Sequence, residues 1–114
     1  MDEVREAIRR VSNAAFTQRY RLELMLEVAD SDDAIVSLTE LSKALGVTTS
    51  NIQRPFESLV LTRLITPLPD SDSRFRYHIR NPSAAWDWAY ELAGLDRASV
   101  KAGAWKTATS VLTF

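Results

Sequence analysis

Apolar residues recur at helical spacing along the first 29 residues of the chain. They predict a first helix that begins at Asp2, and a second helix from Thr17 to Ala29. The stripe on the first helix consists of Val4, Ala7, Ile8, Val11 and Ala15. Apolar positions cover more than half the circumference of the second helix, so we expect it to be the central core helix. The stripe on the first helix must pack against a partner surface.

Two helix-capping signals follow on either side of a single glycine. Ser37 and Glu40 have the spacing of a capping box, which predicts a short helix ending at Gly46. Thr48 is the predicted N-cap of the next helix. Pro55 lies well inside that helix, so we expect either a kink there or a separate first turn.

The clearest strand pattern lies between residues 74 and 80, and a short strand is also expected at 34–36. The alternation predicts a buried face with Phe75, Tyr77 and Ile79, and an exposed face with Arg74, Arg76, His78 and Arg80. The prolines at 67 and 69 restrict the preceding segment to an edge strand, and residues 70–73 should form a loop. The basic row could contact an anion or protect a sheet edge from pairing.

Aromatic residues gather towards the C-terminus. A helix is expected after Asn81-Pro82-Ser83, ending near Gly94, with a shorter helix at 97–102 and an extended segment at 107–114. The aromatic side chains are Trp86, Trp88, Tyr90 and Trp105. Core packing, a ligand pocket or a dimer surface could each use them. We favour a dimer or partner interface formed by Ile8, Val11, Trp86, Tyr90 and Trp105.

Composition limits the classes of function. With 114 residues and 46% hydrophobic content, the chain suits one domain over 1–114, with a core at 17–93. The helix at 2–16 and the segment at 94–114 are then expected to make dimer or partner contacts. The chain has no cysteine and one histidine, so we expect no disulfide, no metal site and no cofactor. No apolar run approaches a membrane span, which predicts a soluble, cytoplasmic protein.

Charge is unevenly distributed, although the net charge is only -1. Residues 1–33 carry eight acidic side chains and five arginines, whereas residues 34–80 carry six basic and four acidic side chains. The second region is therefore the expected anion-facing side. We do not expect an enzyme, because His78 has no nucleophile or carboxylate at a recognisable spacing and no glycine-rich phosphate loop exists. No catalytic residue is assigned.

Several segments together match one known pattern: the run from Leu41 to Arg54, then Leu59, Arg63-Leu64-Ile65 and the strand from Arg74 to Ile79. In this order they resemble winged helix-turn-helix regulators of the ArsR and MarR type. The resemblance covers roughly residues 20–93. It implies a mainly α fold with a small β-hairpin wing, a helix at 49–63 in the major groove and a strand at 74–80 as the wing. The DNA-contacting residues it implies are Thr48, Thr49, Ser50, Asn51, Gln53, Arg54, Arg74, Arg76 and His78.

The resemblance implies a dimeric transcriptional regulator that binds double-stranded DNA sequence-specifically. ArsR-type metal sensing is not implied, because its cysteine and histidine clusters are absent. Asp70 and Asp72 are departures that could turn the wing loop away from phosphate. The alternative is a winged-helix module that binds a partner protein through its aromatic C-terminal region and acidic N-terminal helix.

Overall fold

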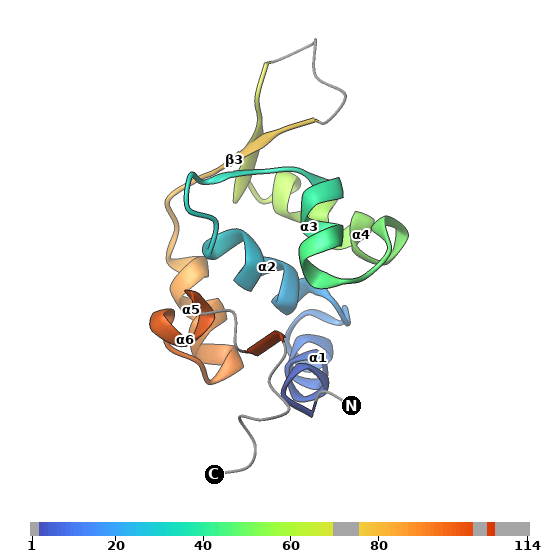
Figure 1. Cartoon of the computed structure of the whole chain (residues 1–114), viewed down its shortest axis with the longest axis vertical. Coiled ribbons are helices and arrows are strands. Elements are labelled where there is room, and N and C mark those ends of the chain that lie inside the picture. Colours follow the sequence, from blue (N-terminus) through green and yellow to red (C-terminus); the bar gives the residue numbers. More distant parts are fainter. Residues whose placement is uncertain (1–2, 70–75, 102–104, 107–114) are drawn as a thin grey trace.

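The computed structural model describes residues 3–69, 76–101 and 105–106, and its described part is mainly helical with a small antiparallel sheet (Figure 1). In chain order the elements are α1 (Glu3–Phe16), α2 (Arg21–Ala29), β1 (Ile35–Val36), α3 (Leu38–Leu45), α4 (Thr49–Leu61), β2 (Ile65–Pro67), β3 (His78–Arg80), α5 (Ala84–Ala93) and α6 (Arg97–Lys101). The predicted extended segment at 107–114 and the loop at 70–73 lie outside the described residues. No helix in the described ranges is long and apolar enough to cross a bilayer.

Helix α2 lies at the centre, as its apolar circumference predicts. It is in contact with α1, α3, α4 and α5 (Figure 1). Its almost completely buried side chains are Leu22, Leu24, Met25, Leu26 and Val28. The helix begins at Arg21 rather than at the predicted Thr17, because Thr17 has a φ of 57° and the chain turns there before the helix starts.

The two capping signals form the expected corner between α3 and α4. The Ser37 hydroxyl accepts a hydrogen bond from the Glu40 N–H at 3.2 Å. Gly46 takes a φ of 68°, the left-handed conformation that closes a helix. The Thr48 hydroxyl accepts from the Asn51 N–H at 3.3 Å and caps α4.

Helix α4 runs without interruption through Pro55, so the alternative of a separate first turn is wrong. Pro55 is fully buried, and the Ser58 hydroxyl donates to its carbonyl oxygen at 2.7 Å. The helix ends at Leu61 rather than 63, because Arg63 takes a φ of 65° and the chain leaves the helical path. Pro55 has no backbone N–H and therefore cannot donate the usual hydrogen bond within the helix. Burial of its apolar ring on the inner face of α4 offsets part of this cost.

The sheet has the strand order β1-β3-β2, and β3 pairs antiparallel with both neighbours. Pro67 lies in β2 at the edge, as predicted. The face prediction is wrong for the residues of β3, although Arg76, which precedes the strand, is exposed as predicted. His78 is 8% exposed whereas Ile79 is 36% exposed, so the basic side of β3 turns towards the helices. Arg80 is accommodated there because its Nη1 donates to the carbonyls of Val28, Ala29 and Ser31 at 2.8–3.0 Å.

The terminal aromatic residues lie in the core of a single chain. Ile8, Trp86, Tyr90 and Trp105 are buried, and Val11 is partly buried against the same core. The prediction that this set forms an exposed dimer or partner surface is therefore wrong. The reason is that α1, α5 and residues 105–106 fold back against α2, so that their apolar side chains cover its flank (Figure 1).

Trp88 is the exception among these aromatic residues, because it is 44% exposed. Its ring meets Phe16 edge to face, with the centroids 5.5 Å apart. The pair joins the end of α1 to α5 at the surface.

Candidate nucleic-acid interface

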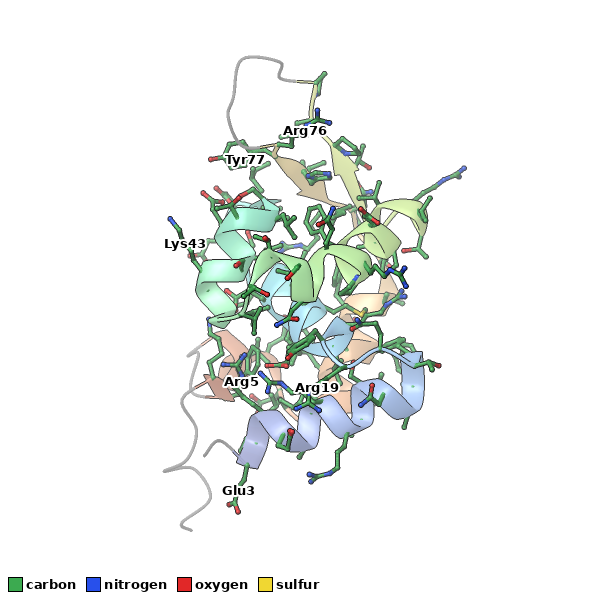
Figure 2. The ribbon with its side chains drawn as sticks, turned by 90° about the vertical axis from the view of Figure 1, so that its right-hand side faces the viewer. Glu3, Arg5, Arg19, Lys43, Arg76 and Tyr77 are labelled. Carbon is green, nitrogen blue, oxygen red and sulfur yellow. The ribbon has the colours of Figure 1, made fainter. Side chains whose placement is uncertain are left out.

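The N-terminal half of α4 presents polar side chains to solvent. The exposed residues are Thr48, Thr49, Ser50, Asn51, Gln53 and Arg54. On the opposite face Ile52, Phe56 and Leu59 are buried in the core and fix the rotation of the helix about its axis. In Figure 2, α3 and α4 face the viewer between α1 below and the strands above. Lys43 lies at the left on α3, and Arg76 lies near the top beside the strands.

The first N–H groups of a helix have no acceptor within the helix, which gives its N-terminal end a positive partial charge; in α4 the Asn51 N–H of this turn is bonded to Thr48. Two hydroxyls order the turn. Thr48 Oγ1 caps the helix and lies 3.0 Å from Ser50 Oγ. The same hydroxyls could accept or donate hydrogen bonds to a phosphate or a base edge. The arrangement suits an anionic, hydrogen-bonding ligand.

Arg76 is exposed beside the sheet, and the neighbouring Tyr77 hydroxyl donates to Glu40 at 3.4 Å. This contact joins the end of the strand to the start of α3. Arg74, also predicted to bind DNA, lies outside the described residues. The segment that leads into β3 therefore brings the exposed guanidinium of Arg76 to the side of the molecule that carries α4 (Figure 2).

His78 does not lie where an exposed DNA contact should be. Its ring packs edge to face on Phe56 of α4, with the centroids 4.8 Å apart. Its Nδ1 is 3.1 Å from the Arg76 carbonyl oxygen. Burial lowers the pKa of His78 below its ordinary value, because the charged form loses hydration; the hydrogen bond to the Arg76 backbone opposes this shift, and the Arg76 charge adds to it. His78 is therefore a packing residue between strand and helix.

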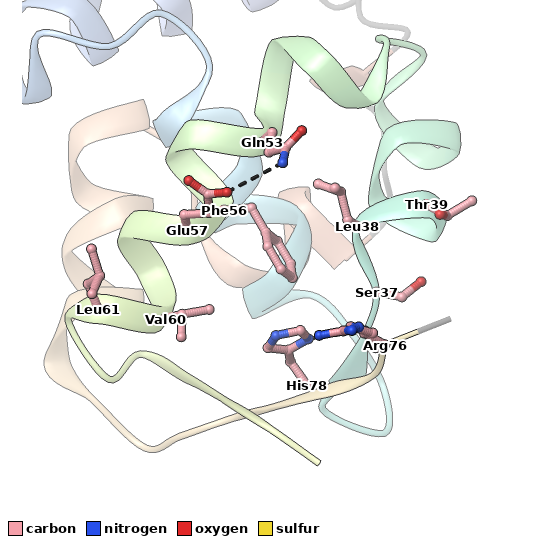
Figure 3. A pocket seen from close by; sticks show the side chains of 10 residues that line it. All are labelled: Ser37, Leu38, Thr39, Gln53, Phe56, Glu57, Val60, Leu61, Arg76 and His78. Atoms are coloured by element: carbon pink, nitrogen blue, oxygen red, sulfur yellow. Dashed lines mark hydrogen bonds between the residues drawn. The ribbon is translucent and has the colours of Figure 1, made fainter. Parts of the chain in front are cut away.

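A groove of about 670 Å³ separates α4 from β3 and the start of α3 (Figure 3). Leu38, Phe56 and Val60 form its apolar part. Gln53, Glu57 and Arg76 supply polar groups, and Gln53 Nε2 donates to Glu57 at 3.4 Å. Leu61 also lines the groove and is 83% exposed. One wall of the groove is thus the helix that carries the candidate DNA contacts.

A buried ion network between α1 and α2 contacts the corner between α3 and α4. Glu23 of α2 is completely buried and accepts from Arg5 at 2.7 Å and from Arg9 at 2.6 Å. Arg5 also donates to the Leu45 carbonyl oxygen at 2.8 Å, immediately before Gly46. Two helices therefore meet at the Glu23 carboxylate, and Arg5 links them to the end of α3. Glu23 was not singled out from the sequence; the available signal was a carboxylate between two leucines in a helix that is apolar over more than half its circumference.

Among the described residues, no group of three or more histidine, cysteine, aspartate or glutamate side chains is placed to hold a metal ion. No family model matches the chain, and comparisons with curated proteins and with solved structures give no significant match. Functional inference therefore depends on the geometry of α4, the strands and the groove between them.

Proposed function

We propose that the protein is a sequence-specific, double-stranded-DNA-binding transcriptional regulator with a winged helix-turn-helix. In this proposal α3 and α4 are the helix-turn-helix, and β2 and β3 are the base of the wing. The observation that carries it is the division of α4 into an inner face buried in the core and an exposed N-terminal half rich in hydrogen-bonding side chains. A helix of this kind fits the major groove of B-DNA.

The side chains on α4 match the groups that bases display. Arg54 can donate two hydrogen bonds to guanine, and Gln53 or Asn51 can pair with adenine. Thr49 and Ser50 can bond phosphate oxygens beside the helix N-terminus. Together these residues supply both positioning contacts and base contacts.

Phosphate contacts outside α4 are few. Lys43 on α3 and Arg76 beside the sheet are exposed cations on the elements that neighbour α4 (Figure 2). His78 and Arg80 are engaged inside the protein and are not proposed as contacts. Because each neutralised phosphate releases counterions, binding should weaken with salt but with a shallow slope.

We also propose that the protein acts as a homodimer, which would place two copies of α4 on a palindromic site. With Ile8, Trp86, Tyr90 and Trp105 inside the protomer, the better centre for such an interface is the exposed Trp88, which packs on the partly buried Phe16. Trp88→Glu should dissociate a dimer, as sedimentation velocity would show.

The experiment is fluorescence anisotropy against a randomised duplex pool and the DNA upstream of the gene, across a salt series. Arg54→Ala should relax the preference at one base pair at a cost of about 1–3 kcal/mol. Arg76→Ala should weaken binding to all sequences alike and flatten the salt slope. Arg10→Ala, an exposed arginine on α1, is the matched control and should change neither.

Two results would count against the proposal. Wild-type protein that binds no duplex at low salt would exclude DNA binding. Equal losses on every sequence from Arg54→Ala and Arg76→Ala would exclude α4 as a base-reading helix.

The second candidate function is a protein-interaction module. The observation that favours it is the apolar part of the groove together with Leu61, which is unusually exposed for a leucine at 83%. The surface expected from the sequence does not serve here, because Trp86, Tyr90 and Trp105 are buried. Absence of DNA binding together with a stable hetero-complex that Leu61→Glu disrupts would favour this function.

A further inference from the structure

One acidic side chain lies on the helix proposed to enter DNA. Glu57 is exposed one turn after Gln53 and lines the groove that faces Arg76 (Figure 3). Within the described part of the chain, Gln53 is its only hydrogen-bonding partner, and Glu57 forms no ion pair there. A carboxylate at this position repels phosphates, so it lowers non-specific affinity.

The contact with Glu57 orients the amide of Gln53. An ionised carboxylate can only accept hydrogen bonds, so the Gln53 amide nitrogen must face Glu57 (Figure 3). The Gln53 carbonyl oxygen is then directed away from Glu57, and one N–H remains free. That leaves one acceptor and one donor in a defined order, which is what pairing with adenine requires.

Glu57 also has its own base preference. Glutamate accepts hydrogen bonds from the amino group of cytosine in the major groove, whereas guanine O6 and N7 and thymine O4 are acceptors that repel it. Its charge therefore favours DNA that presents an amino group near this turn of α4 and disfavours DNA that does not.

We infer that Glu57 is a specificity-determining residue of α4, which fixes the side-chain orientation of Gln53 and excludes duplexes that place only acceptors or phosphates beside it. The inference rests on the proposed DNA-binding function. In this role Glu57 lowers the affinity for incorrect DNA sequences, while the other side chains of α4 form attractive contacts with the correct one.

Glu57→Gln tests the inference, because it removes the charge while keeping the size of the side chain. Affinity for a random duplex should rise about three- to tenfold, while affinity for the selected site stays the same or falls, so that discrimination between them decreases. Glu91→Gln on α5 is the matched control for loss of one exposed carboxylate and should leave the discrimination unchanged.

The double variant Gln53→Ala/Glu57→Gln separates the two parts of the effect. If Glu57 acts partly through Gln53, then in the Gln53→Ala background Glu57→Gln should no longer alter the preference at the base pair that Gln53 reads. It should still raise affinity for random DNA. Thermal unfolding of each variant shows whether α4 remains folded, since a solvent-exposed pair of this kind stabilises a helix only slightly.

The outcomes distinguish this inference from the proposed function. Wild-type protein that selects a sequence, with Glu57→Gln showing the same ratio of selected to random affinity, overturns the role of Glu57 and leaves DNA binding intact. Wild-type protein that binds no duplex overturns both. A reduced ratio in Glu57→Gln alone, with Glu91→Gln unchanged, supports the inference.

Discussion

At the scale of single residues, we expect the loss of buried Glu23 to lower stability more than the loss of an exposed carboxylate. Its buried carboxylate is paired with Arg5 and Arg9, so Glu23→Gln leaves two guanidinium groups with reduced compensation. We expect the free energy of unfolding to fall by about 3–5 kcal/mol, as measured by urea denaturation. Glu6→Gln, which removes the exposed pair with Arg19, is the control and should have a much smaller effect. Equal effects would contradict the importance of burial.

His78 predicts a specific pH dependence. Its folded pKa lies below the ordinary value of 6.5, so the unfolded chain takes up the proton more readily. The stability that this residue contributes is present above pH 6.5 and is lost as the pH falls through the folded pKa. Urea midpoints between pH 8 and pH 5 should show this loss in the wild type and a weaker one in His78→Gln. Parallel curves would exclude His78 as the cause.

At the scale of elements, the corner between α3 and α4 depends on the left-handed conformation of Gly46. A Cβ would meet no atom there, so Gly46→Ala should cost only the backbone strain, about 1–2 kcal/mol by chemical denaturation. Gly94→Ala at the end of α5 has the same geometry and should cost a similar amount. Only Gly46→Ala should also weaken the proposed DNA binding, because it alone adjoins α4. Weakening by both variants would point to lost stability instead.

At the scale of the whole molecule, residues 105–106 belong to the core rather than to a separate interface. Trp105 is 2% exposed, and Lys106 pairs with Glu27 of α2 at 2.7 Å. Trp105→Ala should therefore lower the free energy of unfolding by about 3–5 kcal/mol in denaturant titrations. Trp88→Ala, at a half-exposed tryptophan, should cost less. A larger loss from Trp88→Ala would contradict this assignment.

The sequence by itself determined the elements whose cause is local. The hydroxyls of Ser37 and Thr48 and the glycine at 46 act within a few residues, so the capping predictions were confirmed. The apolar positions over more than half the circumference of α2 placed it at the centre, because helical spacing can be read without knowledge of neighbouring elements. The exposed polar half of α4 followed from the same periodicity.

Tertiary structure decided which face of each remaining element meets another. Alternation along β3 shows that two faces differ, but only the placement of Phe56 and of the end of α2 selects the His78 and Arg80 side as the inner one. The apolar residues of α1 and α5, and Trp105, could pack against a partner protein or against their own chain. They pack in their own core, because the chain path returns these segments to α2. The pairing of Glu23 with Arg5 and Arg9, and the groove beside α4, likewise come from residues far apart in sequence.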